Sequence, residues 1–301
     1  MTEVLRCIYD CRYGPVTFDF GVYLALADCV RQVAGNDVID LTIRADNFRL
    51  QTNRDKAMSR AEKEWRLRSI ILGVCDLLPT LRDVTVLRSK TDGKYDFPAN
   101  YPAEFYDVYY RTPYLAADVL ELHKLGADPR VFTATEHAKA VMNREEAYVT
   151  FTLRQSQHFP TRNVDLSEWD KFGDHVRRKF GLDVVFVPDT EAVLTGQSCG
   201  GFGSGVCHTA ALDQRLRMAL YEGAVMNVCS SNGPAAMMFY SKAPVLQFDQ
   251  MRGGVFNAEK WDAANGFKNG GQFPWSAPNQ RMTWVDSTYE NLVEHFEKVM
   301  A

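Results

Sequence analysis

The stretch that decides the fold reads VMNVCSSNGPAAMMFYSKAPVLQF and covers Val225–Phe248. It predicts a buried strand over Ala224–Cys229, a turn of small residues, a helix from Pro234 to about Lys242, and a second strand over Pro244–Phe248. Proline suits the first helical position, because its missing N–H would have no partner there. A helix that opens from the carboxyl end of a strand presents backbone N–H groups, and such an arrangement binds phosphate.

The turn supplies five candidate ligand-binding residues: Ser230, Ser231, Asn232, Gly233 and Pro234. Asn232 can cap the helix, and Gly233 lets a ligand approach the backbone closely. The alternative is ordinary α/β geometry with no ligand. Because no Walker or G-x-G-x-x-G signature occurs at an equivalent turn, this turn is the best lead to a binding site.

The composition is that of a soluble enzyme. The chain has 301 residues, of which 46% are hydrophobic and 24% charged, and its net charge is −4. This balance argues against a nucleic-acid partner or an anionic membrane surface. The start of the chain lacks the apolar core of a signal peptide, and no apolar run approaches the ~20 residues of a membrane span. We therefore expect a cytoplasmic protein without a transmembrane segment.

The seven cysteines are odd in number and scattered, so we expect reduced thiols. Cys199 and the pair Cys207-His208 are conceivable metal ligands, but their spacing fits no standard zinc pattern. We expect no metal site there. The more ordinary interpretation is a glycine-rich mobile loop over Gly196–Gly205.

Strands and helices alternate in two halves of the chain, which predicts an α/β fold. In the first half, strands are expected over Val4–Tyr9, Asp37–Arg44 and Val84–Arg88, with helices over Phe18–Ala34 and residues 54–78. The pattern restarts at the strand 147–153. The expected architecture is two Rossmann-like domains, residues 1–145 and 146–301, that face each other across a cleft.

The second half continues with a helix over Ser167–Phe180, a strand over Val184–Val187 and a helix over Asp213–Glu222. The chain closes with an amphipathic helix, about Tyr289–Met300. We expect this last helix to cross back to the first domain, where Leu292, Val293 and Phe296 would pack across the seam.

Ligands of open parallel sheets bind at the carboxyl ends of the strands, so the loops that follow the strands are the expected rim of a site. In the second half, these loops are residues 154–163, 188–194 and 230–234.

The first of these loops carries Arg154, His158, Arg162 and Asn163. Guanidinium groups bind phosphates in bidentate fashion and neutralise a departing anionic group. The alternative is that Arg154 makes a structural salt bridge and Arg162 lies on the surface.

The second loop places Asp189 and Glu191 directly after a strand. Two carboxylates there can bind ribose hydroxyls, orient an arginine or hold a metal. For Asp189, capping of a helix is an equally good explanation.

A fourth candidate segment joins the first strand to the first helix in the other half. Tyr13, Thr17 and Phe18 are expected on the acceptor side of a cleft. Asp19 could act as a catalytic base, although an acidic residue in the first turn of a helix is commonly there for the helix dipole.

The run Tyr148–Glu191 (YVTFTLRQSQHFPTRN…VVFVPDTE), followed by residues 219–248, resembles the donor-binding half of GT-B glycosyltransferases. The layout is similar to the fucosyltransferase-like and heptosyltransferase-like groups, and about 100 residues carry the resemblance. The chain lacks the Arg-Arg-Gly-Asp and Gly-Gly-x-Gly-Asn motifs of fucosyltransferases, which leaves the donor sugar open.

The resemblance implies a metal-independent hexosyl- or deoxyhexosyltransferase that needs no cofactor. Its substrates would be a nucleotide sugar, with a GDP-linked donor as one expectation, and a glycan or glycoconjugate acceptor. Carried over by position, Arg154 would contact the donor diphosphate together with the helix N-terminus. Asp189 and Glu191 would lie near the nucleoside, and the residues from Ser230 to Gly233 would hold phosphate or ribose.

Two other functions remain open. A sugar-nucleotide epimerase or hydrolase could use the same fold, and His158 near a reacting sugar would favour it. A non-catalytic nucleotide-sugar-binding protein would keep the fold without turnover. The residues do not decide the donor base, the sugar, the acceptor, the stereochemistry or the oligomeric state.

Overall fold

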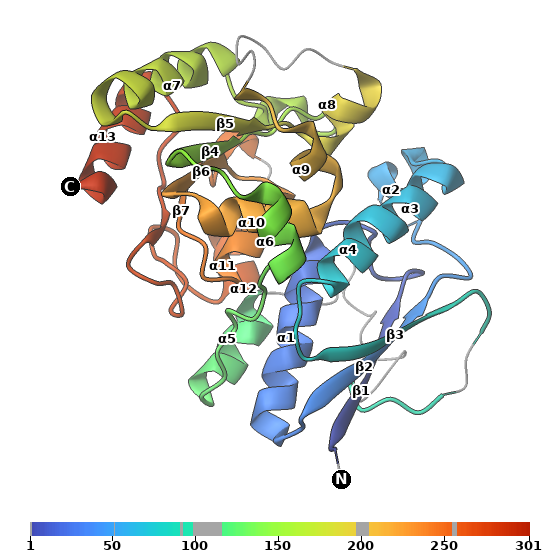
Figure 1. Ribbon diagram of the computed structural model, residues 1–301. Helices are drawn as coiled ribbons and strands as arrows, with labels where there is room; N and C mark the ends of the chain where they lie inside the picture. The colour runs from blue at the N-terminus through green and yellow to red at the C-terminus, as the bar shows by residue number, and fades with distance from the viewer. Residues whose placement is uncertain (1, 51, 91–92, 99–115, 197–204, 255–257) are drawn as a thin grey trace. The chain divides into compact units, whose positions relative to one another are not determined.

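The computed structural model describes residues 2–50, 52–90, 93–98, 116–196, 205–254 and 258–301. The chain forms two compact units (Figure 1). The first comprises Met1–Phe132 and Ala264–Gly266, and the second comprises Thr133–Ala263 and Phe267–Ala301. Each unit contains its own parallel sheet.

Helix α6 (Glu136–Met142) lies in the second unit, so the expected seam near residue 145 falls inside that unit. The reason is a carboxylate on helix α10 (Gln214–Gly223). Glu222 accepts a hydrogen bond of 3.0 Å from the backbone N–H of Ala134 and pairs with the Lys139 ammonium at 3.4 Å. These ties hold α6 against α10.

The sheet of the first unit has three parallel strands in the order β1-β2-β3. The strands are β1 (Val4–Asp10), β2 (Val38–Arg44) and β3 (Leu81–Leu87). Strand β3 is largely half-exposed, as suits an edge. On the other side of β1, Phe97 adds a short extension, because its carbonyl accepts from the Ile8 N–H at 3.0 Å. The three strands expected in this half are confirmed.

Helix α1 (Asp19–Ala34) carries the chain from β1 back to the start of β2. It buries nine residues, including Phe20, Tyr23 and Leu24, and ends at Gly35 with φ +77°. Helix α5 (Ala116–Lys124) packs on it. The α/β crossover expected for this segment is therefore present.

The single helix expected over residues 54–78 is wrong in detail. The structure has α2 (Asn53–Ala57), then α3 (Arg60–Arg66), a π-helical turn η1 (Leu67–Ile71) and α4 (Leu72–Cys75). Met58 is extended, and the Ser59 hydroxyl caps a new helix by accepting from the Glu62 N–H at 3.1 Å. A capping serine inside a periodic stretch thus ended one helix and started the next.

The second unit has a five-stranded parallel sheet in the order β5-β4-β6-β7-β8. The strands are β4 (Tyr148–Thr152), β5 (Asp183–Val187), β6 (Met226–Ser230), β7 (Val245–Phe248) and β8 (Gln280–Met282). Every residue of β4, β6 and β7 is buried, as expected for strands covered on both faces. The strand–turn–helix–strand predicted over 225–248 is confirmed.

Further helices of this unit alternate with its strands along the chain. They are α7 (Leu166–Phe180), α8 (Thr190–Thr195), α9 (His208–Leu212), α10, α11 (Gly233–Phe239), α12 (Ala258–Asn265) and α13 (Tyr289–Met300), with 3₁₀ turns η3 (Pro160–Arg162) and η5 (Arg252–Gly254). Asp165 caps α7, two residues before the expected Ser167. Across the described residues, no helix combines the length and apolar character that a membrane crossing requires.

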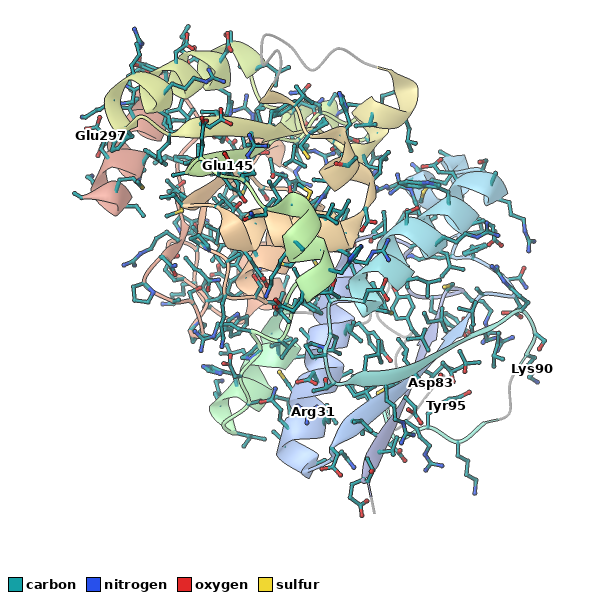
Figure 2. The ribbon with its side chains drawn as sticks, in the orientation of Figure 1. Arg31, Asp83, Lys90, Tyr95, Glu145 and Glu297 are labelled. Atoms are coloured by element: carbon teal, nitrogen blue, oxygen red, sulfur yellow. The ribbon has the colours of Figure 1, made fainter. Side chains whose placement is uncertain are left out.

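The last helix, α13, belongs to the core of the second unit, so the expected packing of Leu292, Val293 and Phe296 across the seam is wrong. Leu292 and Phe296 are fully buried there, and the Phe296 ring lies 5.4 Å from that of Phe172 on α7. Glu297, labelled in Figure 2, accepts from His175 at 2.9 Å. The C-terminal segment that returns to the first unit is Ala264–Gly266.

Candidate functional site

The candidate site lies where the strand order of the second sheet reverses. From β4 the chain runs to β5 on one side, and later reaches β6 on the other side of β4. The loops after β4 and β6 therefore leave neighbouring strands in opposite directions. Such a switch point is where ligands bind in open α/β sheets.

Side chains join the ends of β4 and β6. The Ser230 hydroxyl accepts from the Arg154 N–H at 2.9 Å, and the Asn232 side-chain amide donates to the Thr152 carbonyl at 3.0 Å. The Asn232 side-chain oxygen Oδ1 also accepts from the Ala235 N–H at 2.9 Å, which caps α11 as expected. The two rim loops predicted from the sequence thus lie side by side.

The two arginines of the β4 loop are both partly exposed. The Arg154 guanidinium donates to the His158 carbonyl. The Arg162 guanidinium donates to the carbonyl and the hydroxyl of Ser231, at 3.1 and 3.3 Å. These hydrogen bonds orient the two guanidinium groups beside the ends of β4 and β6. Arg162 is therefore placed against the β6 turn rather than alone on the surface.

A glycine after β7 makes room for Arg162. Gly253 in η5 has φ +77°, and a Cβ there would meet the Arg162 Cγ and the Thr161 hydroxyl at 2.9 Å. Turns η3 and η5 pack together at this point. The backbone after β7 thus forms part of the support of Arg162, which the sequence pattern did not indicate.

Ser156 organises the rest of the β4 loop. Its N–H donates to the Asn163 side chain and its carbonyl accepts from the same amide, both at 3.0 Å. Its hydroxyl donates to Glu191 at 2.8 Å and accepts from the His158 N–H at 3.1 Å. Asn163 and Glu191, both expected to bind the donor, are thus hydrogen-bonded within the protein, where they hold the loop. Ser156 was missed, because one serine in a polar loop carries no pattern.

Asp189 caps α8 by accepting from the Glu191 N–H at 3.2 Å, so the capping role proposed for it is confirmed. Burial raises the pKa of its carboxyl above the usual value, while the charges of Arg154 and Arg217 act in the opposite direction. Arg217 is buried and donates to the Ala210 carbonyl at 2.6 Å. It is a further charged neighbour that sequence reasoning missed, because it follows the buried face of α10.

The N-terminus of α11 offers fewer donors than expected. Gly233 occupies the first helical position and Pro234 the second, one position later than predicted, and Pro234 has no N–H. The next N–H, of Ala235, is taken by Asn232. Among the first three positions, the exposed Gly233 N–H is thus the donor that the described hydrogen bonds leave for a ligand.

The four candidates of the first unit follow β1. Thr17 donates to Asp19 at 2.7 Å, Asp19 is the exposed first residue of α1, and Phe18 precedes it without capping the helix. The Arg12 guanidinium lies 4.9 Å from the centre of the Tyr13 ring. These residues therefore cluster at the carboxyl end of β1, within their own unit.

Within the described part of the chain, no group of three or more His, Cys, Asp and Glu side chains is gathered as a metal site would require. Cys207 contacts the Thr209 hydroxyl at 3.5 Å. Cys199 and most of the glycine-rich stretch Gly196–Gly205 lie outside the described residues.

Comparison of the sequence with protein-family models and with curated proteins gives no match. Among solved structures, the fold is similar to a glycosyl transferase family 9 protein from Veillonella parvula DSM 2008, with a TM-score of 0.55 and 11% identity over 99% of this chain and 97% of that one. It is also similar to E. coli ADP-heptose LPS heptosyltransferase II, with a TM-score of 0.53 and 9% identity over 99% and 98%.

These likenesses extend over the whole chain, so the GT-B-like α/β fold that the sequence resemblance implied is confirmed. The site adds two oriented guanidinium groups and one exposed backbone N–H at the switch point of the second sheet. Groups of this kind bind phosphate and stabilise negative charge as it develops.

Proposed function

We propose that the chain is a glycosyltransferase, and that its second unit binds the nucleotide-sugar donor. The single observation that carries the proposal is the pair Arg154 and Arg162 at the switch point between β4 and β6. A dianionic diphosphate needs bidentate donors, and arginine supplies them. The fold shared with glycosyltransferases supports this assignment.

In the proposed reaction, an acceptor hydroxyl attacks the anomeric carbon of the donor sugar. The new bond forms between acceptor oxygen and anomeric carbon, and the bond from that carbon to the diphosphate oxygen breaks. The electron pair leaves with the nucleoside diphosphate, where Arg154, Arg162 and the Gly233 N–H stabilise the added charge without a metal. The hydroxyl proton passes to a base, for which Asp19 is the candidate.

The remaining residues have supporting roles in the proposal. Asp189 and Glu191 lie on the nucleoside side, and Ser231 orients Arg162. Ser230 and Asn232 hold the two loops together, while Tyr13, Thr17 and Phe18 would contact the glycan acceptor. The described cysteines are free thiols, as in a reducing compartment, which supports a cytoplasmic location.

The donor base is a separate question. The E. coli protein of similar fold is named for ADP-heptose, so ADP is the first nucleotide to test. The expectation of a GDP-linked donor gains no support from these structures. Whether the transferred sugar is a hexose, a deoxyhexose or a heptose is decided by turnover with matched donors.

The proposal is tested with Arg154→Ala, because the loop contact to Ser230 uses the backbone N–H of Arg154 and survives the substitution. Loss of one such donor lowers turnover by about 10²–10³-fold. Arg215→Ala is the matched control: Arg215 is half-exposed in the same unit and pairs with Asp213. Its turnover should stay at the wild-type level.

Binding is measured first, by thermal shift with ADP, GDP, UDP and CMP. A nucleotide at 100 times its Kd adds about 2.7 kcal/mol to the free energy of unfolding. If no nucleotide stabilises the protein, the donor site is rejected. Donor hydrolysis or epimerisation without transfer to any acceptor would instead select the epimerase or hydrolase, and binding without any turnover would select a binding protein.

A further inference from the structure

Phe159 lies on the β4 loop, between Arg154 and Arg162 in the sequence. Its side chain is 46% exposed. The other large hydrophobic residues with exposed side chains in the described part of the chain are aliphatic: Val33, Leu50, Leu125, Val141, Leu194 and Val225. An aromatic ring is thus presented to solvent next to the proposed diphosphate site.

The backbone of Phe159 is strained. Its φ is +55°, a left-handed conformation that a bulky L-residue rarely adopts. Asp249 is the other described non-glycine residue with positive φ, but it is buried and its carboxylate accepts from the Ser287 N–H and hydroxyl at 2.9 and 2.7 Å. Phe159 is instead exposed, and residues held in rare backbone conformations cluster at functional sites.

The loop holds the ring in this place from both sides. On one side, the Arg154 guanidinium binds the His158 carbonyl. On the other, the Phe159 carbonyl accepts from the Arg162 N–H at 3.0 Å, and Pro160 follows with a fixed φ. The His158 ring lies against the Phe159 ring, with 4.2 Å between centroids and a tilt of 56°. The rings of His158 and Phe159 together form a small aromatic surface, the aromatic shelf.

The shelf also connects to the nucleoside side of the proposed site. The His158 N–H donates to the Ser156 hydroxyl, which donates to Glu191. Hydrogen bonds of the His158 backbone thus link the shelf to Arg154 on one side and, through Ser156, to Glu191 of the β5 loop on the other. A nucleotide has the matching chemistry, since its phosphates are anionic and its base is a flat ring that stacks on aromatic side chains.

From this placement we infer that Phe159, backed by His158, is the stacking surface for the base of the donor nucleotide. The inference rests on the proposed function and adds to it the residue that recognises the base. Stacking tolerates every base because each has a flat π-face, so Phe159 supplies affinity, and the choice of base is left to other contacts.

The test compares two ligands, ADP and inorganic diphosphate, in titration calorimetry of the full chain. Phe159→Ala should weaken ADP binding about tenfold or more, as expected for loss of one stacked base, while the affinity for inorganic diphosphate changes less than about twofold. Phe159→Trp should keep ADP binding close to wild type, because the larger ring still stacks. GDP, UDP or CMP replaces ADP if thermal shift selects it.

The Phe159→Gly variant distinguishes the effect of losing the aromatic ring from the effect of the backbone strain. Glycine tolerates positive φ, so this variant should unfold no earlier than Phe159→Ala and still lose the same ADP affinity. Equal losses for ADP and inorganic diphosphate, or no loss at all, would overturn the inference. A loss for ADP-glucose but not for ADP would also overturn it, because the ring would then serve the sugar. If wild type binds inorganic diphosphate but no nucleotide, the proposed function falls as well.

Discussion

The arginines at the ends of β1 and β2 and the arginines of the β4 loop differ in the groups to which they donate hydrogen bonds. In the first unit, arginines near the ends of β1 and β2 pair with carboxylates: Arg12 with Asp10 at 2.5 Å and Arg44 with Asp46 at 2.8 Å. Beyond β2, buried Arg49 pairs with Asp55 at 3.0 Å. In the second unit, the bonds that orient Arg154 and Arg162 go to carbonyl and hydroxyl oxygens.

The same α/β layout therefore serves two purposes. Where opposite charges neutralise each other inside the protein, they hold loops in place and offer little to a ligand. In the β4 loop, hydrogen bonds to carbonyl and hydroxyl oxygens orient guanidinium groups, which are the kind of group that binds anions. We expect substitutions of the first kind of arginine to lower stability, and substitutions of the second kind to lower nucleotide binding and turnover.

The largest effect on stability should follow from Arg49→Ala. The side chains of Arg49 and Asp55 are each 7% exposed, so the substitution leaves a buried carboxylate without its ion pair. Removing one partner of a buried pair costs about 3–5 kcal/mol. Urea unfolding should show this loss. Arg60→Ala is the control, because Arg60 is 70% exposed and 4.0 Å from Glu64, and its loss should cost at most about 0.5 kcal/mol.

An intermediate effect is expected from a pair of glycines in η5. Gly253→Ala and Gly254→Ala both place a side chain at positive φ, +77° and +62°, which costs about 1–2 kcal/mol each. A Cβ at Gly253 also meets the Arg162 Cγ at 2.9 Å, whereas a Cβ at Gly254 meets nothing within 4 Å. Both variants should unfold earlier, but nucleotide affinity should fall only for Gly253→Ala. Equal affinities would show that Arg162 does not hold the ligand.

The smallest effect concerns Asp189. Burial raises the pKa of its carboxyl, so the folded protein holds the proton more tightly than the unfolded chain. Its ionisation therefore costs stability, and the free energy of unfolding falls as pH rises through the folded-state pKa. Asp189→Asn keeps the cap of α8, since the two residues cap about equally well, and removes the titration.

The Asn variant should therefore be slightly more stable than wild type at pH 7, and the difference should shrink as the pH is lowered toward 4. Thermal unfolding midpoints across this range measure it. A difference in midpoint that stays constant with pH would mean that burial does not raise the pKa of Asp189.

The sequence predicted the fold where one local rule decides the outcome. The apolar runs of β4 and β6 identified central parallel strands, and the small residues of the Ser230–Pro234 turn identified the junction between a strand and a helix. It failed where the outcome depends on distant partners. The periodicity of α13 shows that Leu292 and Phe296 are buried, but not against which helix.

The residues of the candidate site were also only partly accessible from the sequence. Arg154, Asp189 and Asn232 were singled out as candidates because each lies two residues after the end of a strand. Ser156, Arg217 and Gly253 were not found, since their roles come from contacts with residues far along the chain. The backbone conformation of Phe159 was also invisible, because a bulky residue at positive φ contradicts local preference and needs the folded loop to hold it.

The return of Ala264–Gly266 to the first unit has a consequence for synthesis on the ribosome. Gly266, with φ +76°, fits so closely on α5 that a Cβ there would meet the Leu120 Cδ2 at 2.9 Å. Nascent proteins generally fold from the N-terminus as the chain emerges. Here residues 264–266 complete the first unit, and they are synthesised only after residues 133–263. The surface of α5 that they cover therefore stays open until nearly the whole chain has been made. The folding of the first unit is completed late, although most of it is translated first.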